Sequence, residues 1–169
     1  MQTWEAITSR RNVRSFTEQQ IGTEDLHRIL EAGRRAPSSR NLQPWDFVVV
    51  TDHVQLQELS KVWVGAGHVA GAVTAIALIV GPAEEPGHRD EFDLGQATMA
   101  MMVTAADVGI GTAHSAVGDQ DLARQLLGLP ADHTCAYLIS LGYPADRPLA
   151  PVSKPNRRPF DEVVHWGRW

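Results

Sequence analysis

Apolar residues recur along the chain at two spacings, one typical of helices and the other of strands. The helical spacing predicts helices over residues 4–9, from Thr23 up to Pro37, over residues 53–62 and 93–108, and from Asp119 to Gly128. Short apolar runs predict strands over residues 45–50, 74–80 and 135–141. The run at 74–80 is apolar at nearly every position, so we expect that strand to be buried on both faces.

Capping residues support the predicted helix ends. Thr3 and Asp119 precede helical segments and can accept hydrogen bonds from the first N–H groups of each helix. Gly128 is typical of a helix end, because it adopts the left-handed backbone conformation without strain. Helices and apolar strands in this order indicate an α/β or α+β fold, with a central sheet covered on both faces.

The helix over residues 93–108 is apolar on nearly every side. One stripe is formed by Leu94, Ala97, Met101, Met102, Ala105 and Val108. The opposite side is also small or apolar, at Ala100, Val103 and Ala106. Such a helix is buried in something larger than one small domain, so we expect it to face a partner subunit as well as the core.

Composition narrows the class of protein. A chain of 169 residues is expected to form one domain over residues 1–169. The net charge of −5 argues against a general nucleic-acid binder, and no apolar run has membrane-spanning length, so neither nucleic acid nor membrane is an expected partner. The N-terminus lacks the pattern of a secretory signal, and the single cysteine, Cys135, suits a reducing cytoplasm.

An arginine cluster, Arg10, Arg11 and Arg14, lies in the polar segment after the first predicted helix. Three guanidinium groups in five residues repel one another unless an anion or acidic side chains offset them. A phosphate is a natural partner, since the planar fork binds its oxygens in pairs. A solvated basic loop explains these residues alone equally well.

A polar loop, residues 36–45, separates a predicted helix from a predicted strand. Its Ser38, Ser39, Asn41 and Gln43 offer neutral donors and acceptors suited to a polar ring edge or to ribityl hydroxyls. Taken alone, an ordinary capped turn is the simpler interpretation.

Two further segments carry candidate chemistry. The first, residues 109–112, includes Gly111 and Thr112 and reads by itself as a plain helix end. The second, residues 154–160, includes Arg157 and Arg158 and could close on the same anion from another direction. The apolar residues that follow Arg158 argue against a freely disordered tail.

Other chemistries fit the sequence poorly. The glycines of residues 65–71 resemble a dinucleotide fingerprint, but a helix precedes them and a strand follows, the reverse of what that motif requires. The histidines show no metal-ligand spacing, and no nucleophile elbow surrounds Ser38 or Ser39. Cys135 lies inside an apolar strand and is expected to be inert.

Taken in order, these segments resemble the nitroreductase family, the FMN-dependent reductases of nitro compounds and quinones. The resemblance rests on six segments: residues 10–16, residues 36–45, Asp93-Leu94-Gly95 leading to Gly109-Ile110-Gly111, residues 127–130, residues 141–144 and the tail at residues 157–166. It implies a central mixed sheet flanked by helices, in an intertwined homodimer that exchanges its C-terminal arms. The residues at 81–92 form only a short loop where longer members insert helices.

The resemblance also implies roles for individual residues. Arg10, with one or both of Arg157 and Arg158, would hold the FMN phosphate, with Arg11 and Asn12 beside the phosphate or the ribityl chain. Arg14 would reach the pyrimidine edge of the flavin. The other subunit would contribute Pro37, Ser38, Ser39 and Asn41, and the cofactor would also contact Gly111 and Thr112. The backbone donor to flavin N5 would fall near residues 116–118, while His68 and His114 are candidates for contact with the ring.

The expected activity is a ping-pong transfer of hydride from NADH or NADPH, through FMN, to a small electron-poor acceptor such as a nitroaromatic or quinone. The cofactor carries that chemistry, so no catalytic side chain is expected. Alternatives are a dehydrogenase or oxidase step, a deazaflavin-dependent reductase, and an FMN-binding sensor or carrier with little turnover.

Overall fold

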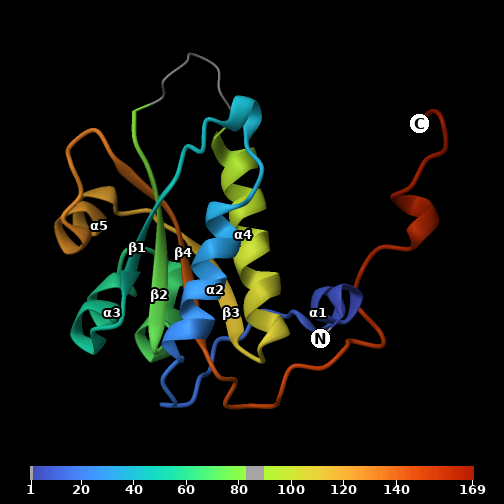
Figure 1. The fold of residues 1–169 in the computed structure, drawn as a ribbon, viewed down its shortest axis with the longest axis horizontal. Helices are drawn as coiled ribbons and strands as arrows, with labels where there is room; N and C mark the ends of the chain where they lie inside the picture. Colours follow the sequence, from blue (N-terminus) through green and yellow to red (C-terminus); the bar gives the residue numbers. More distant parts are fainter. Residues whose placement is uncertain (1, 83–89) are drawn as a thin grey trace.

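The computed structural model describes residues 2–82 and 90–169, and a four-stranded sheet lies at its centre (Figure 1). The strands run in the order β1-β2-β4-β3, and every neighbouring pair is antiparallel. Their bounds are Asp46–Val50 for β1, Thr74–Val80 for β2, Gly111–Ala116 for β3 and Thr134–Gly142 for β4.

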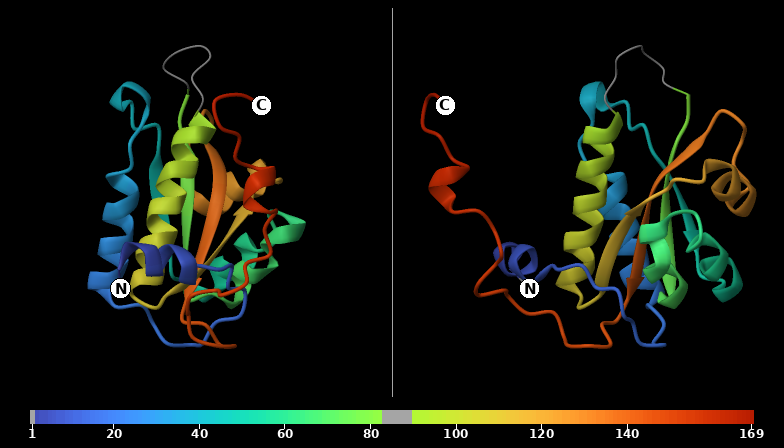
Figure 2. Two further views of the ribbon diagram at one scale, coloured as in Figure 1. Left: turned by 90° about the vertical axis from the view of Figure 1, so that its right-hand side faces the viewer. Right: turned by 180° about the vertical axis from the view of Figure 1, so that it is seen from behind.

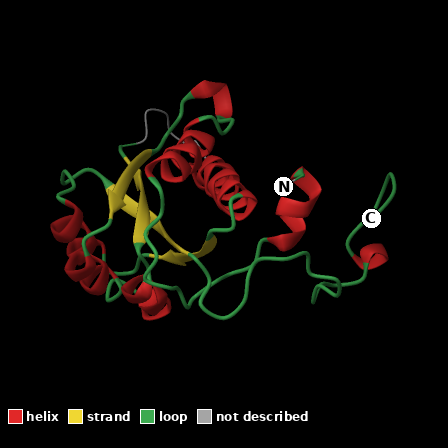
Figure 3. Ribbon diagram, turned by 60° about the horizontal axis from the view of Figure 1, so that its bottom comes forward, coloured by secondary structure: helices red, strands yellow, loops and turns green. Residues whose placement is uncertain are grey.

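Helices cover both faces of this sheet (Figures 1 and 3). One face carries α2 (Thr23–Arg34) and α4 (Asp90–Asp107), which pack against each other. The other carries α3 (His53–Leu59), the 3-10 helix η2 (Val64–Gly71) and α5 (Gln120–Leu127). Alternate residues of β2 pack against the helices on the two faces of the sheet, because successive side chains of a strand point to opposite faces. Ile76 and Leu78 belong to the core under α2 and α4, and Ala75, Ala77 and Ile79 to the core under α3 and α5.

Three short elements lie outside these layers. Helix α1 (Thr3–Ser9) packs against α4, and the 3-10 turn η1 (Ser39–Asn41) follows α2. The C-terminal segment leaves the sheet after β4 and extends away from the body with the 3-10 turn η3 (Phe160–Glu162) near its end (Figure 2). Within the described residues, no helix has the length and apolar character needed to cross a bilayer.

Helix α4 joins the core and also presents apolar side chains to solvent. Met101 and Met102 are fully buried, and Met101 lies so close to Gly33 of α2 that a Cβ there would stand 2.8 Å from its side chain. On the outer side, Phe92 is 71% exposed and Met99 is 49% exposed. The apolar character predicted for this helix is therefore confirmed. In a single chain, some of its apolar side chains stay exposed to solvent.

The structure confirms the α+β class and the two-sided burial of β2, and it corrects several details. Among residues 2–82 and 90–169, the strands of the sheet pair only antiparallel, not in the mixed arrangement expected, and the one parallel contact is an isolated bridge between Asn12 and Thr112. Residues 109–112 are more than a helix end, because β3 begins at Gly111. Thr3 lies inside α1 and does not cap it, while Asp119 caps α5 as predicted by accepting from the Leu122 N–H.

Candidate functional site

The arginine segment is held against the sheet by its main chain. The Val13 N–H donates to the Thr112 carbonyl at 2.9 Å, and a second bridge joins Phe16 to Pro144. Val13 is buried, whereas Asn12 and Arg14 on either side of it are exposed, as extended backbone requires. The sequence thus fixes the arginines by burying the apolar residue between them.

Gly111 and Thr112 take part in this anchoring. Both are buried in β3, and neither lines the cleft that contains Arg10. A Cβ on Gly111 would stand only 2.6 Å from Val13 Cγ2, so the absence of a side chain permits the close approach of the two segments. Their contact with a cofactor stays a prediction, while their structural role is visible.

A cleft of about 1080 Å³ opens between α1, α4 and the C-terminal segment. Arg10, Arg11, Asn12 and Arg157 all line it, so the structure brings together predicted site residues from the two ends of the chain. The rest of the lining is mainly apolar and includes residues that the sequence did not mark as part of a site: Trp4, Ile7, Met99, Ala100, Val103 and Val152. For the residues of α1 and α4, the signal is the set of apolar residues on the outer sides of these helices; Ala100 and Val103 were expected there, but facing a partner subunit. No signal marked Val152.

Arg10 and Arg157 share this cleft without a carboxylate partner in the part of the chain that the structure describes. Arg10 donates to the neutral Asn12 Oδ1 at 3.2 Å, and Arg157 donates to the main-chain carbonyl of Asn156 at 2.7 Å. Partial burial, and then the charge of Arg157, lower the pKa of Arg10. Two cations that line one cleft in this way fit a bound phosphate, which would offset both charges.

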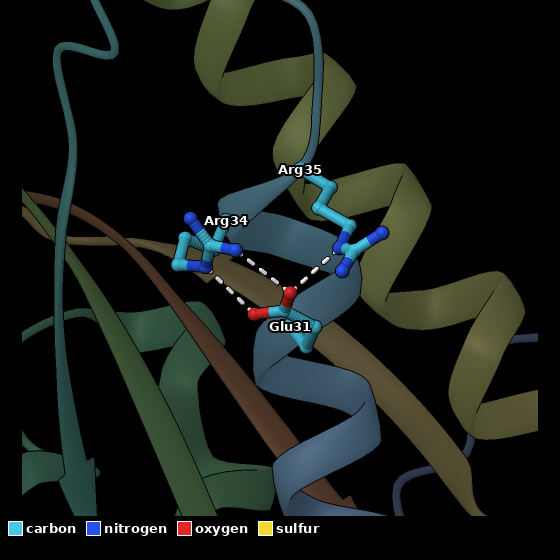
Figure 4. A network of polar contacts seen from close by, with 3 residues as sticks. All are labelled: Glu31, Arg34 and Arg35. Atoms are coloured by element: carbon cyan, nitrogen blue, oxygen red, sulfur yellow. Dashed lines mark hydrogen bonds and ion pairs between the residues drawn. The ribbon is translucent and has the colours of Figure 1, made fainter.

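Other arginines are already neutralised. The Arg11 guanidinium contacts the Asp146 carboxylate at 2.7 Å, and Arg158 contacts Glu162 at 3.5 Å. At the end of α2, Arg34 and Arg35 both donate to Glu31 (Figure 4), and these hydrogen bonds lower the Glu31 pKa to about 2. Of the two predicted tail arginines, Arg157 therefore fits a phosphate better than Arg158.

The charge of Arg14 acts on a buried histidine, His68. His68 is 9% exposed, and its Nδ1 lies 2.8 Å from Ser140 Oγ, while Nε2 is buried without a hydrogen bond of normal geometry. Burial lowers the His68 pKa, and the nearby charges of Arg14 and His114 lower it further. His68 is therefore neutral at pH 7, and it belongs to the region of Arg14 and not to the solvent.

In the segment expected to donate a backbone hydrogen bond to flavin N5, one N–H group already has a partner within the protein. The Gly118 N–H donates to the Val62 carbonyl at 3.0 Å, so it is not free for a ligand. The N–H groups of Ala116 and Val117 stay as the predicted candidates.

The polar loop adopts an unusual backbone. Among the described residues, the non-glycine positions with positive φ are Arg40, Asn41 and Gln43, all in this loop. Such conformations persist only where surrounding contacts hold them, and they are concentrated at functional sites. The loop is held by Ser38 Oγ, which accepts from the Gln43 N–H at 2.9 Å, and by Asp93 Oδ2, which accepts from the Ser39 N–H at 3.0 Å.

The polar loop and the arginine cleft lie at different levels of α4. The loop contacts Asp93 in the first turn of the helix, whereas the α4 residues that line the cleft run from Met99 to Thr104, roughly 9 to 16 Å further along the axis. Figure 1 shows η1 near one end of α4 and α1 near the other. Pro37, Ser38, Ser39 and Asn41 are therefore not gathered with Arg10 in one chain.

Alternative site chemistries find little support. Among the described residues no group of three or more histidine, cysteine or acidic side chains is placed to hold a metal. Cys135 is fully buried, and burial raises its pKa to about 12, which leaves it without the thiolate that a nucleophile needs.

The chain thus has an α+β fold, a cleft lined by Arg10 and Arg157, and a polar loop at a distance from that cleft. The sequence matches the model of the nitroreductase family over residues 7–71 and 62–143. The chain therefore belongs to the nitroreductase family.

Individual relatives agree with this assignment. A protein of Archaeoglobus fulgidus, provisionally named NADH dehydrogenase/NAD(P)H nitroreductase, is 33% identical over 146 residues, which cover 83% of this chain and 84% of that protein. FMN reductase [NAD(P)H] of Bacillus subtilis is 27% identical, with 95% of this chain and 71% of that protein covered. Among solved structures, the NADPH:FMN oxidoreductase of Vibrio harveyi complexed with NAD+ superimposes with a TM-score of 0.83 at 27% identity, covering 99% of this chain and 77% of that one. The protein has the fold of these nitroreductases.

Proposed function

We propose that this protein is an FMN-dependent oxidoreductase that passes reducing equivalents from NADH or NADPH to a small electron-poor acceptor. Membership in the nitroreductase family supports the class of reaction, and the names of relatives support the cofactor and the donor. The observation that carries the proposal for this chain is the pair Arg10 and Arg157, two cations that share a cleft without a carboxylate between them.

The cofactor site follows from this pair. Arg10 and Arg157 hold the FMN phosphate, and Asn12, which accepts from Arg10, keeps that guanidinium oriented. Arg14 faces the pyrimidine edge of the flavin, and its charge also acts on the buried His68. Arg11 stabilises the start of the tail through Asp146 and contacts the ligand only at its edge.

The polar loop completes the site from a second subunit. Pro37, Ser38, Ser39 and Asn41 lie beside the first turn of α4, away from the arginine cleft of their own chain, so they line the cofactor held by the partner. Each subunit, a single domain over residues 1–169, then contributes one half of each of the two cofactor sites in the dimer. The strained backbone of the loop supports a role in binding, since strain of this kind is retained where it serves a ligand.

Exposed apolar side chains support a homodimer with exchanged arms. On the body, Trp4 and Phe92 are 74% and 71% exposed, and on the tail Trp166 and Trp169 are 83% and 99% exposed. Patches of this kind on a folded protein mark interfaces. The tail extends beyond its own body (Figure 2), so it embraces the partner and there covers its apolar residues. We also propose a cytoplasmic location, which the use of a nicotinamide donor and a buried free cysteine support.

When bound, FMN supplies the redox chemistry, alternately accepting and releasing two electrons in a ping-pong cycle. The residues of this chain bind and tune it. Arg14 places positive charge where the reduced ring is negative, which eases reduction. Arg10 and Arg157 fix the phosphate and hence the depth of the ring. No described side chain is required as an acid or base.

Two measurements test this function. The purified protein is expected to show the visible spectrum of bound flavin and to oxidise NADH or NADPH when a nitroaromatic or quinone is added. A full complement of FMN with no turnover from any donor would replace the reductase with an FMN-binding sensor or carrier. Turnover only with a reduced deazaflavin, or only with another substrate class, would reassign the donor or the reaction. A protein that neither contains nor takes up FMN contradicts the proposal as a whole.

A further inference from the structure

Asp93 is a buried acid that serves a segment far from it in the chain. It is 2% exposed, and its Oδ2 accepts from the Ser39 N–H at 3.0 Å. Its Oδ1 accepts from Gln96 Nε2 at 3.2 Å, and the same amide donates to the Pro37 carbonyl at 3.2 Å. Asp93 and Gln96, one turn apart on α4, thus bind the main chain of the polar loop at two successive points.

This arrangement differs from ordinary helix capping. Asp52 and Asp119 accept N–H groups of the helices that they begin. Asp93 accepts an N–H from η1, 54 positions earlier. A buried carboxylate is unfavourable unless hydrogen bonds compensate its loss of water, so its presence at this position indicates a specific use.

The backbone that Asp93 holds indicates what this carboxylate does. Directly after Ser39, the positive φ angles of Arg40 (52°) and Asn41 (59°) are strained for residues with a side chain. Without fixed contacts on both sides, these residues would relax into more favourable conformations. The hydrogen bond that the Ser39 N–H donates to the Asp93 carboxylate is stronger than one between neutral groups, and it fixes the start of the turn.

We infer that Asp93 is a positioning residue for FMN, which acts through the Ser39 N–H to keep Ser38, Ser39 and Asn41 arranged for the cofactor of the partner subunit. This inference rests on the proposed function, because it assigns that loop to the FMN site. Asp93 itself contacts no cofactor. Its effect is preorganisation: a loop already in its bound shape loses less conformational entropy when FMN binds.

The test compares FMN affinity and amide hydrogen exchange in the dimeric protein. Asp93→Ala is expected to weaken FMN binding roughly tenfold and to accelerate exchange in residues 38–43 of the FMN-free form. Asp93→Asn, which keeps an acceptor but loses the charge, is expected to lie between Asp93→Ala and the wild type. Ile79→Val, a core change on the opposite face of the sheet, controls for general loss of stability and is expected to leave both readouts unchanged.

A second pair of variants isolates the N–H group. Ser39→Pro removes the donor, and the extended backbone of Ser38 (ψ 156°) accepts a following proline. Ser39→Ala removes only the hydroxyl and is the matched control. If Asp93 acts through this N–H, Asp93→Ala weakens FMN binding in the Ser39→Ala protein but adds nothing in the Ser39→Pro protein.

The outcomes separate the two proposals. Unchanged FMN affinity and loop exchange in Asp93→Ala, in a protein whose wild type binds FMN, overturn the positioning role and leave the proposed function intact. Faster loop exchange with unchanged affinity likewise overturns it, because the loop would then be held without benefit to the cofactor. A wild-type protein that binds no FMN overturns the proposed function first, and the positioning role falls with it.

Discussion

Arg11 is tied to Asp146 by a charged hydrogen bond of 2.7 Å, and the same nitrogen donates to the Arg147 carbonyl at 2.9 Å. This contact lowers the Asp146 pKa and fastens the first residues of the C-terminal segment to the N-terminal one. Of three arginines that look equivalent in the sequence, one is therefore used to direct the tail. Arg10, in contrast, bonds the neutral Asn12 and has no carboxylate partner among the described residues.

The tail contact gives the first prediction. Arg11→Ala and Asp146→Ala are each expected to speed proteolytic cleavage of residues 145–169, because both release the start of the segment. The Asp146 side chain is half exposed, so the change in unfolding free energy should be small. Limited proteolysis, with chemical unfolding in parallel, measures both effects. Equal cleavage rates in wild type and variants would show that the pair does not direct the tail.

The phosphate cations give the second prediction. Arg10→Ala and Arg157→Ala are each expected to weaken FMN binding by about 1.5–3 kcal/mol, the range for a hydrogen bond to a charged group. Fluorescence titration measures the affinity. Riboflavin, which lacks the phosphate, is the matched control ligand and should bind wild type and variants alike. Arg158→Ala, whose guanidinium is engaged by Glu162, is the control variant and should change FMN affinity little.

The sequence predicts the elements of this fold better than their pairing. Strand β2 is apolar at nearly every position, so its burial on both faces could be predicted from residues 74–80 alone. Strand β3 (Gly111–Ala116) was missed, because its residues are mostly small and Thr112 is its single β-branched side chain. It is a strand because β4 offers a free edge and because the Val13 segment packs over Gly111.

The candidate site shows a similar division. The arginines and the polar loop could be selected by residue type, since guanidinium groups suit phosphate and Ser and Asn suit a polar ligand. The role of each arginine could not be predicted in this way. Arg11 differs from Arg10 through its contact with Asp146, which lies 135 positions away in the sequence. The buried Asp93 was read only as part of a motif that opens a helix, and its bond to Ser39 depends on tertiary packing.

Arg14 gives the third prediction. Arg14→Ala is expected to leave FMN bound but to lower its midpoint potential by about 30 mV, which corresponds to about 1.4 kcal/mol for a two-electron couple. The reason is the loss of positive charge next to the ring as it gains electrons. Spectroscopic titration against a reference dye measures the potential, and rapid mixing measures slower reduction by the nicotinamide. Arg14→Lys, which keeps the charge, should restore most of both; an unchanged potential in Arg14→Ala would remove Arg14 from the flavin.

His68 gives the fourth prediction, which concerns pH. Because its pKa in the folded protein is lowered below 6.5, the unfolded chain binds the proton more readily, so stability is complete above pH 6.5 and falls as the pH drops below that value. One linked proton limits the slope to about 1.4 kcal/mol per pH unit. His68→Gln cannot titrate and should flatten the profile between pH 7 and 5. Glu31 and Asp146, with lowered pKa values, lose their contributions only at lower pH. Urea unfolding of the FMN-free protein at fixed concentration tests this, and identical profiles would contradict it.

Gly111 gives the last prediction, because its missing side chain sets the position of the arginine segment. An added Cβ would stand 2.6 Å from Val13 Cγ2, and Val13 is itself 1% exposed and cannot move without displacing its neighbours Asn12 and Arg14. Gly111→Ala is therefore expected to lower the unfolding free energy by about 1–3 kcal/mol and to weaken FMN binding as well.

A compensating change makes this prediction specific. Val13→Ala removes the atoms that the new methyl group would meet, so the double variant Val13→Ala/Gly111→Ala should be more stable than the sum of the two single changes allows. Gly71→Ala, where an added Cβ meets nothing within 4 Å, is the control and should change stability by no more than about 0.5 kcal/mol. Denaturant unfolding and FMN titration of the wild type, the two single variants and the double variant measure the coupling. Strict additivity would mean that strand β3 and the arginine segment do not determine each other's position.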